Sequence, residues 1–245
     1  MNARYFLLEL VRQLRNARAL IFTFAIPIFL LLLFGGIYGH EYDKAAHLQW
    51  VVVTTIQEAA YGAMMASLSQ AFQIVNERSV GWNRQLRITP LSGTGYMITK
   101  VAATLAVALV AIIVVFLVGI VFLHASLSPL GWILAALGLW LGIIPFALIA
   151  ILIGQFAKPS FAQPLFMVVF LGLAVLGGLW IPLDIFPVWV SNFAQAVPSY
   201  WLNKVGQMGA SLSGNVLDPV IVLGAWTIVF AALITWRYRR DSARA

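Results

Sequence analysis

Six long runs of apolar residues alternate with short polar connections along this chain. Each run is long enough to cross about 30 Å of hydrocarbon as an α-helix, which rises about 1.5 Å per residue. The runs are continuous and do not alternate apolar with polar residues, as the strands of a membrane barrel do. The pattern predicts an all-α membrane protein with a single transmembrane domain over residues 1–245 and six transmembrane helices at about residues 20–37, 50–74, 101–123, 132–153, 164–181 and 219–236.

The segment before the first run, residues 3–18, has a helical period of its own. Its apolar side chains fall on one helix face, at Leu7, Leu10, Val11 and Leu14. Its polar side chains fall on the opposite face, at Glu9, Arg12, Gln13 and Asn16. This pattern is typical of a helix lying in the membrane interface, so we predict an N-terminal interfacial helix. A simple basic anchor for the first span is the alternative interpretation.

The connection between the fifth and sixth runs, residues 182–215, is interrupted by proline too often to span the membrane, yet is too apolar for an ordinary exposed loop. Residues 188–196 form a short helical pattern between Pro187 and Pro198. The aromatic residues nearby are of the kind found where hydrocarbon meets water. We predict re-entrant helices on the outer side, with their backbone shielded by other helices.

Composition and charge placement support the membrane assignment and orient the chain. Only 9% of the residues are charged and 62% are apolar, whereas a soluble domain carries about 25% charged residues. Thirteen of the fifteen Lys and Arg residues fall on one side of the six-span arrangement, and only Lys44 and Lys204 fall on the other. Because basic loops stay inside, we predict a multi-pass protein of the cell inner (cytoplasmic) membrane with both termini cytoplasmic. The net charge of +7 then reflects topology and not a nucleic-acid partner.

The connection between the second and third runs is polar and basic. It reads NERSVGWNRQLRITPLS over residues 76–92, and Lys100 begins the next run. The pair Thr89–Pro90 ends its helical pattern, because the residue before a proline is pushed out of the α region. We therefore predict a short helix on the cytoplasmic surface.

These features occur together in a recognisable order. The opening Gln13-Leu14-Arg15-Asn16 precedes a first span that contains Pro27, and a proline-rich series from Ile181 to Tyr200 precedes the last span. With the 76–92 segment, they make the chain resemble the permease subunits of type-2 ABC exporters, which include drug, antibiotic and polysaccharide exporters. The resemblance covers essentially the whole chain.

The resemblance implies partners and a coupling site. Family members pair with a second copy of themselves or a paralogous permease, above ABC ATPase subunits. A cytoplasmic coupling helix between spans 2 and 3 docks on the ATPase. The implied ATPase-coupling residues are Glu77, Arg78, Gly81, Trp82, Arg84, Leu86, Arg87, Thr89 and Pro90. A topogenic loop, basic only because it lies inside, is the alternative for this segment.

One ionisable residue, Glu58, lies well inside a span, about 12 Å past Trp50 at 1.5 Å per residue. A carboxylate there is costly and should face a cavity or a partner. Our hypothesis is a substrate pathway along this helix, in which Glu58 contacts a cationic or hydrogen-bonding substrate. The alternative is a polar contact between helices. The candidate pathway residues are Thr54, Gln57, Glu58, Tyr61, Met65 and Ser69.

Other chemistry is missing from the sequence. No G-x-x-x-x-G-K-[ST] motif for nucleotide phosphates is present, and there is no cysteine. His40 and His47 lie near acids in a short outer loop, which we interpret as solvated and not as a metal site. We predict a protein that is not an enzyme, with no catalytic or metal residues and no cofactor on this chain; ATP and Mg would belong to the ATPase.

The substrate is the least determined feature. A drug-like or antibiotic amphiphile is the first expectation, with multidrug efflux and antibiotic resistance as the corresponding biology. A lipid- or glycan-carrier exporter of the same family is the alternative. From a different class, the chain could be a non-transporting membrane scaffold, which would tolerate changes at Trp82 and Leu86.

Overall fold

A computed structural model describes residues 3–38, 42–43, 48–81, 93–181 and 183–242. The chain is almost entirely helical, apart from a two-stranded antiparallel pair of β1 (Tyr42–Asp43) and β2 (Leu48–Gln49). In chain order the helices are α1 (Ala3–Leu14), α2 (Ala17–Tyr38), α3 (Trp50–Ser79), α5 (Gly93–Phe122), α6 (Pro129–Gly142), α7 (Ile144–Phe156), α8 (Pro159–Leu176), the 3-10 turn η1 (Leu183–Ile185), α9 (Val188–Ala194), α10 (Pro198–Ser211) and α11 (Leu217–Ser242).

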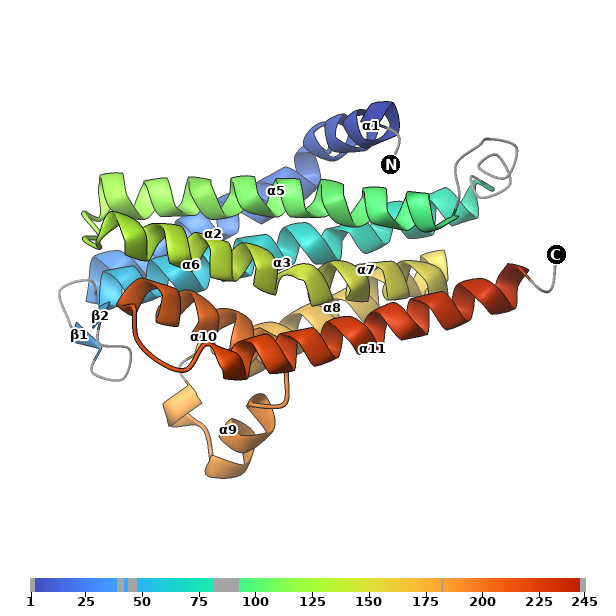
Figure 1. Cartoon of the computed structure of the whole chain (residues 1–245). Helices are drawn as coiled ribbons and strands as arrows, with labels where there is room; N and C mark the ends of the chain where they lie inside the picture. The colour runs from blue at the N-terminus through green and yellow to red at the C-terminus, as the bar shows by residue number, and fades with distance from the viewer. Residues whose placement is uncertain (1–2, 39–41, 44–47, 82–92, 182, 243–245) are drawn as a thin grey trace.

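The long helices form one bundle with two distinct ends (Figure 1). The helix α1, the C-terminal end of α11 and the ends of α3 and α5 that flank residues 82–92 lie at the same end. The β1–β2 pair and the turn between α5 and α6 lie at the other. The basic residues of α1, α3 and the start of α5 are therefore gathered at one end of the bundle, as their placement in the sequence indicates.

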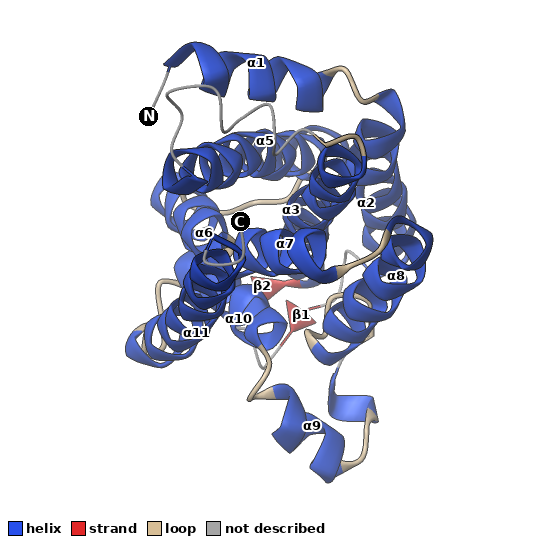
Figure 2. Ribbon diagram, turned by 90° about the vertical axis from the view of Figure 1, so that its right-hand side faces the viewer, coloured by secondary structure: helices blue, strands red, loops and turns tan. Residues whose placement is uncertain are grey.

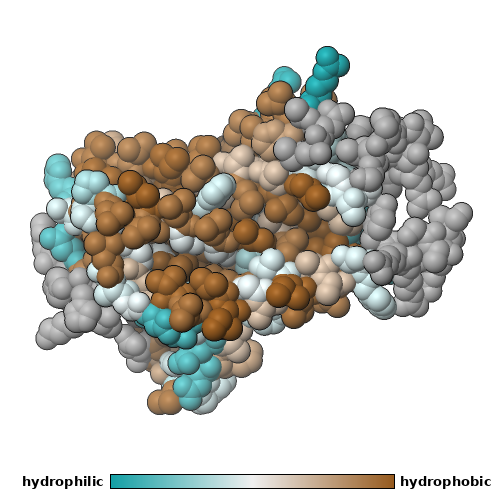
Figure 3. All heavy atoms as spheres, in the orientation of Figure 1, coloured by the Kyte–Doolittle hydropathy of each residue, from teal (hydrophilic) through white to brown (hydrophobic). Residues whose placement is uncertain are grey.

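Among the described residues, five helical segments have the length and the apolar composition needed to cross a membrane. They are Leu20–Ile37, Gly93–Phe122, Pro129–Phe156, Pro159–Leu176 and Leu217–Arg237. Their outer surface is apolar (Figure 3), with Phe29, Val168 and Ile228 among the exposed side chains. Since lipid tolerates such a surface and water does not, the chain is an all-α membrane protein.

The second predicted span corresponds to α3, which has 30 residues but is less apolar than the other five. Its place in the bundle explains this composition. Helices α2, α5, α7, α8 and α10 pack around α3 (Figure 2), and most of its residues are buried. A helix that neighbouring helices shield from lipid can carry polar side chains, and all six candidate pathway residues lie on α3.

The fourth predicted span is two helices in the structure. Residue Ile143 interrupts the path between α6 and α7, where Pro145 occupies the first turn of α7. Proline lacks the N–H that a continuous helix needs there. The glycine pair Gly138 and Gly142 packs against α10 of the same chain: a Cβ added at Gly138 would lie 3.1 Å from the carbonyl oxygen of Val205. Close packing within the subunit therefore uses this G-x-x-x-G pair.

The proline-rich connection forms two helices with different surroundings. Helix α10 lies against α6 and α11 and is shielded by them, which is the environment we expected for a re-entrant helix. Helix α9 projects from the side of the bundle (Figure 1). It exposes Val188, Trp189 and Phe193.

The predicted interfacial helix is α1. Its apolar side chains Leu7, Leu8 and Val11 are exposed, whereas Glu9 and Gln13 are buried against the bundle. The amphipathic pattern is therefore oriented with its apolar face outward, as a helix in contact with lipid requires.

Candidate functional site

The six candidate pathway residues on α3 divide into two groups in the structure. Thr54, Glu58 and Tyr61 are buried within the chain. Gln57, Met65 and Ser69 are half-buried. The stripe predicted from the sequence therefore runs from the core to the edge of this subunit.

Two of the hydroxyl groups on the stripe are occupied by the helix itself. Thr54 Oγ1 donates to the carbonyl oxygen of Trp50 at 2.6 Å, and Ser69 Oγ donates to that of Ala66 at 2.9 Å. Such local bonds satisfy a hydroxyl without any partner from another helix. These two residues supply little free polarity to a ligand in this conformation.

One side of the stripe packs against α8 through aromatic rings. The ring of Tyr61 lies 5.2 Å from that of Phe170 and 5.5 Å from that of Trp180, measured between centroids. Gln57 Nε2 donates to the carbonyl oxygen of Gly178, just past the end of α8, at 3.1 Å. These contacts fix the end of α8 to the centre of α3.

The other side of the stripe packs against α2. A Cβ added at Gly62 would lie 3.2 Å from the carbonyl oxygen of Thr23 and 3.4 Å from Pro27. Thr23 is the residue whose carbonyl Pro27 cannot bond within the helix. Met65 is one turn from both Tyr61, which contacts α8, and Gly62, which contacts α2. The half-buried part of the stripe therefore faces outward between α2 and α8.

Glu58 lies one helical turn from Gly62 on the same side of α3. It is 2% exposed, and its Oε2 atom has no hydrogen-bond partner among the described residues. Buried carboxyl oxygens are normally hydrogen-bonded, so an unpartnered one needs an explanation. Ionisable residues inside a membrane most often mark a ligand or ion site.

A second polar stripe, on α10, was not identified from the sequence. Ser199, Asn203 and Gln207 follow one another at every fourth position and are buried. Asn203 Nδ2 donates to the carbonyl oxygens of Gly177 and Gly178 at 3.1 and 3.2 Å. The spacing of these polar residues within an apolar segment was the available signal. Their contacts hold the turn after α8, where Gly178 has φ +65°.

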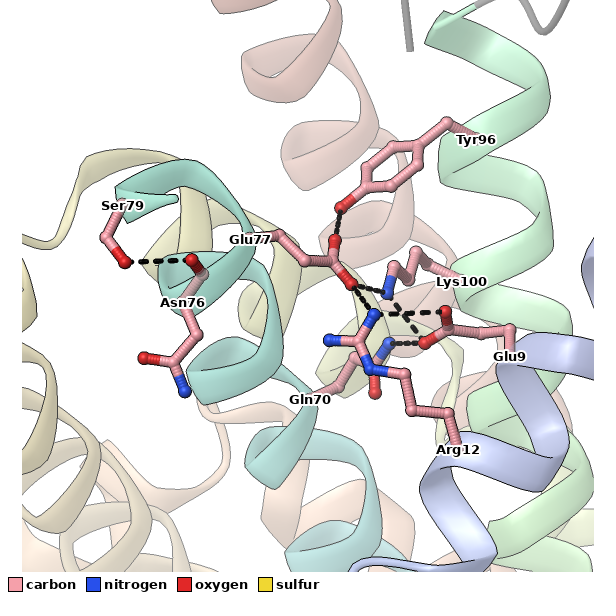
Figure 4. A network of polar contacts seen from close by, with 8 residues as sticks. All are labelled: Glu9, Arg12, Gln70, Asn76, Glu77, Ser79, Tyr96 and Lys100. Carbon is pink, nitrogen blue, oxygen red and sulfur yellow. Dashed lines mark hydrogen bonds and ion pairs between the residues drawn. The ribbon is translucent and has the colours of Figure 1, made fainter. Parts of the chain in front are cut away.

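At the basic end of the bundle, Lys100 is completely buried between two glutamates (Figure 4). Its Nζ lies 2.6 Å from Glu9 Oε1 and 2.6 Å from Glu77 Oε1. Glu9 comes from α1, Glu77 from α3 and Lys100 from α5. One ammonium group thus joins three helices.

Three further side chains complete this ion network. Arg12 of α1 donates to Glu77 Oε1, and Tyr96 of α5 donates to Glu77 Oε2. Gln70 Nε2 donates to Glu9 Oε1 at 3.0 Å. The two carboxylates and two cations balance in charge, as buried ions must. We call Glu9, Arg12, Gln70, Glu77, Tyr96 and Lys100 the ion network.

The surroundings of Glu9 favour its ionised form. Burial by itself would raise the pKa of this carboxyl. The charge and hydrogen bond of Lys100, with smaller contributions from Gln70 and Arg12, outweigh burial and hold the pKa below the ordinary 4.5. Glu9 is therefore ionised at neutral pH.

The residues implied in ATPase coupling are described only in part. Glu77 is buried in the ion network. The Arg78 guanidinium donates to the carbonyl oxygens of Gly154 and Ala157, at 2.7 and 3.3 Å, and so caps the end of α7. Gly81 has φ +73°, a conformation that favours glycine. The other implied residues lie outside the described residues: Trp82, Arg84, Leu86, Arg87, Thr89 and Pro90.

No group of three or more His, Cys, Asp or Glu side chains suited to a metal ion occurs among the described residues. His40 and His47, interpreted above as part of a solvated loop, lie outside them.

Comparisons with known proteins agree on one family. The model of a family described as ABC-2 type transporter matches residues 6–208. YvfS of Bacillus subtilis strain 168, named as a transport permease, is 26% identical over 96% of this chain and 96% of its own length. DrrC of Mycobacterium tuberculosis strain H37Rv, named as a doxorubicin resistance ABC transporter permease protein, is 24% identical over 95% of this chain and 86% of its own length.

Proposed function

This chain belongs to the ABC-2 type transporter family, and on that premise we propose that it forms the translocation pathway of an ATP-driven exporter for drug-like or antibiotic amphiphiles. As a family member it is the membrane subunit of an ABC transporter. We propose further that a separate ABC ATPase, which carries ATP and Mg, docks on residues 77–90. Both termini would then be cytoplasmic, in the inner membrane.

The observation that carries the pathway is the position of the α3 stripe. Its inner part is covered by this chain, while Met65 and Ser69 are half-buried. Met65 follows one helical turn after Gly62, which contacts α2, and Tyr61, which contacts α8. A second permease placed against α2 and α8 would cover this part and enclose a path between the two subunits. Six membrane crossings per subunit follow if α3, shielded by its neighbours, is counted with the five apolar spans.

The substrate class is supported by chemistry and by one relative. The stripe combines aromatic and thioether side chains with a single carboxyl, which suits an apolar molecule carrying a cation or a hydrogen-bond donor. A relative named for doxorubicin resistance is consistent with that class. Doxorubicin, a flat aromatic molecule that carries a cationic amine on its sugar, is therefore the probe of choice.

The test is transport by a reconstituted complex. The permease would be co-purified with the proposed ABC ATPase partner, to be sought among the neighbouring genes, and placed in proteoliposomes. We expect doxorubicin to stimulate ATP hydrolysis and to be moved across the membrane only when ATP is present. A complex that hydrolyses ATP but responds to a lipid-linked glycan and not to doxorubicin would transfer the assignment to the carrier-export branch. A chain that binds no ATPase would refute the exporter altogether.

A further inference from the structure

The ion network connects α1 to α3 and α5, the helices before and after residues 82–92. Glu77 lies in the last turn of α3 before this segment, and Tyr96 and Lys100 lie in the first two turns of α5 after it. The same carboxylate of Glu77 accepts from Lys100 and Tyr96 on α5 and from Arg12 on α1. Any displacement of the 82–92 segment that moves the ends of α3 and α5 therefore acts directly on α1.

Helix α1 is joined to α3 and α5 through this network. Its outward face consists of exposed apolar residues that face away from the bundle, and its inward face supplies Glu9 and Arg12. Glu9 is held at two points, by Lys100 on α5 and by Gln70 on α3. Gln70 and Glu77 are two helical turns apart, so the attachment resists tilting of α1 as well as sliding.

The energetics favour movement of these helices as one unit. Separating α1 would leave Lys100 beside one carboxylate fewer and would leave Glu9 without its cation, in a site from which water is excluded. Buried charges that lose their partners are strongly unfavourable. A rearrangement that keeps all four charges together avoids that cost, whereas one that leaves α1 behind does not.

We propose that Glu9 and Arg12 are positioning residues that make α1 a moving part of the input from the ATPase. Through Lys100 and Glu77, the interfacial helix follows the ends of α3 and α5 during the transport cycle. This inference rests on the proposed exporter function. It adds a second route, along the membrane surface, by which movement at residues 82–92 reaches α2 and the α3 stripe beside it.

The first experiment releases α1 while leaving the rest of the network in place. The double variant Glu9→Ala/Arg12→Ala removes both charges that α1 contributes to the network. It retains the Lys100–Glu77 pair and the hydrogen bond from Tyr96 to Glu77. Its net charge equals that of the wild type. We expect basal ATP hydrolysis by the co-purified complex to stay within twofold of wild type, and doxorubicin exported per ATP hydrolysed to fall at least fivefold. The variant Arg15→Ala, at an exposed position just after α1, is the control and should export as wild type.

The outcomes separate this proposal from the exporter function. A double variant that exports as much doxorubicin per ATP as wild type would overturn the role of α1 while leaving the exporter intact. A wild-type complex that neither exports nor responds to doxorubicin would refute the proposed function itself.

A second measurement does not depend on any change in the network. The chain has no cysteine, so spin labels can be placed at Leu8→Cys on α1 and Ile98→Cys on α5, both exposed positions. We expect the distance between the labels to be the same in the nucleotide-free and vanadate-trapped complexes, while each label moves relative to one at Phe156→Cys on α7. A change of more than about 5 Å between the first two labels on trapping would show that α1 does not follow α5, and the proposal would be wrong.

Discussion

Helix α3 carries two buried glutamates whose surroundings differ completely. Glu77, at the basic end, accepts hydrogen bonds from a lysine, an arginine and a tyrosine. Glu58, in the middle of the bundle, has an oxygen with no partner among the described residues. Both are almost fully buried. Burial alone therefore does not distinguish a structural carboxylate from one available to a ligand; the number of bonds that it already makes does.

The comparison also assigns different work to the two ends of the molecule. At the basic end, the charges are balanced and connect α1, α3 and α5. In the half of the bundle away from the basic end, the side-chain amides of Gln57 and Asn203 donate to backbone carbonyl oxygens after α8. There the polar groups hold a turn, and the Oε2 atom of Glu58, the carboxyl near them on α3, has no hydrogen-bond partner among the described residues. Experiments on transport should therefore begin with Glu58, and experiments on coupling with the charge-balanced carboxylate of Glu77.

Removing the central cation should have the largest effect on stability. The variant Lys100→Met leaves Glu9 and Glu77 buried, with Arg12 as the one remaining cation of the network. Loss of one partner from a buried ion pair typically costs about 3–5 kcal/mol, so we expect low yield and a markedly lower melting temperature of the purified permease. The matched control is Thr99→Val, since Thr99 is equally buried but bonds only to Gly95 of its own helix.

A triple variant without the buried charges tests whether that loss of stability comes from charge or from shape. In Glu9→Gln/Glu77→Gln/Lys100→Met the three buried groups are uncharged and of similar size. Replacing a buried ion set by neutral groups is often close to neutral in stability, so we expect most of the melting temperature to return. If the triple variant is as unstable as Lys100→Met alone, packing and not charge balance holds this end of the bundle together.

A substitution in the half of the bundle away from the basic end should lower the stability less. The variant Asn203→Leu removes the donor shared by the carbonyl oxygens of Gly177 and Gly178 and leaves Gln207 without its acceptor. Leaving buried polar groups unpaired costs about 1–3 kcal/mol. Thermal unfolding of the purified protein would measure it. Ser211→Ala is a suitable control, because its hydroxyl bonds only within α10 and to the neighbouring Ser213. Equal melting temperatures for the two variants would contradict a role for Asn203 in holding the turn.

The two glutamates should separate most clearly when Glu58 is changed. The variant Glu58→Gln keeps the shape of a side chain whose Oε2 atom has no hydrogen-bond partner among the described residues, so we expect little change in melting temperature and full assembly of the complex. If Glu58 contacts a cationic substrate, doxorubicin export should fall about tenfold, which corresponds to about 1.4 kcal/mol. Met64→Leu, a buried apolar exchange on the same helix, is the control. Unchanged export by Glu58→Gln would assign this carboxyl to helix packing.

The sequence predicts the five most apolar spans well because their apolar runs are local and long. The structure adds what depends on contacts between distant residues. Lys100 was interpreted as part of a basic edge, since nothing in the 76–92 segment indicates that Glu9, ninety-one positions earlier, approaches it. The break at Ile143 also depends on context, because proline alone does not determine whether a helix bends or stops.

Glu58 was found from sequence because a lone acid in an apolar run is conspicuous. The α10 stripe was missed for the opposite reason. Ser199, Asn203 and Gln207 are uncharged and lie in a segment that the prolines made irregular, so their period of four was hidden. Residues that act through charge in a membrane are therefore easier to locate from sequence than residues that act through amide hydrogen bonds.

The smallest expected effect is the pH dependence of the stability that the ion network contributes. The pKa of Glu9 is held below 4.5 by its cations and by Gln70 once burial is outweighed. A carboxyl whose folded pKa is lowered contributes stability that is complete above 4.5 and is lost as the pH falls through its folded pKa. We therefore expect the melting temperature of the purified permease to gain no contribution from Glu9 titration between pH 8 and pH 5, and to decline below about pH 4.5. The variant Glu9→Gln should decline less steeply there, because it has no proton to take up at this position. A difference between the two proteins that develops near pH 6 or 7 would mean that Glu9 is partly protonated at neutral pH, and the contrast with Glu58, on which the assignment of the two ends depends, would be lost.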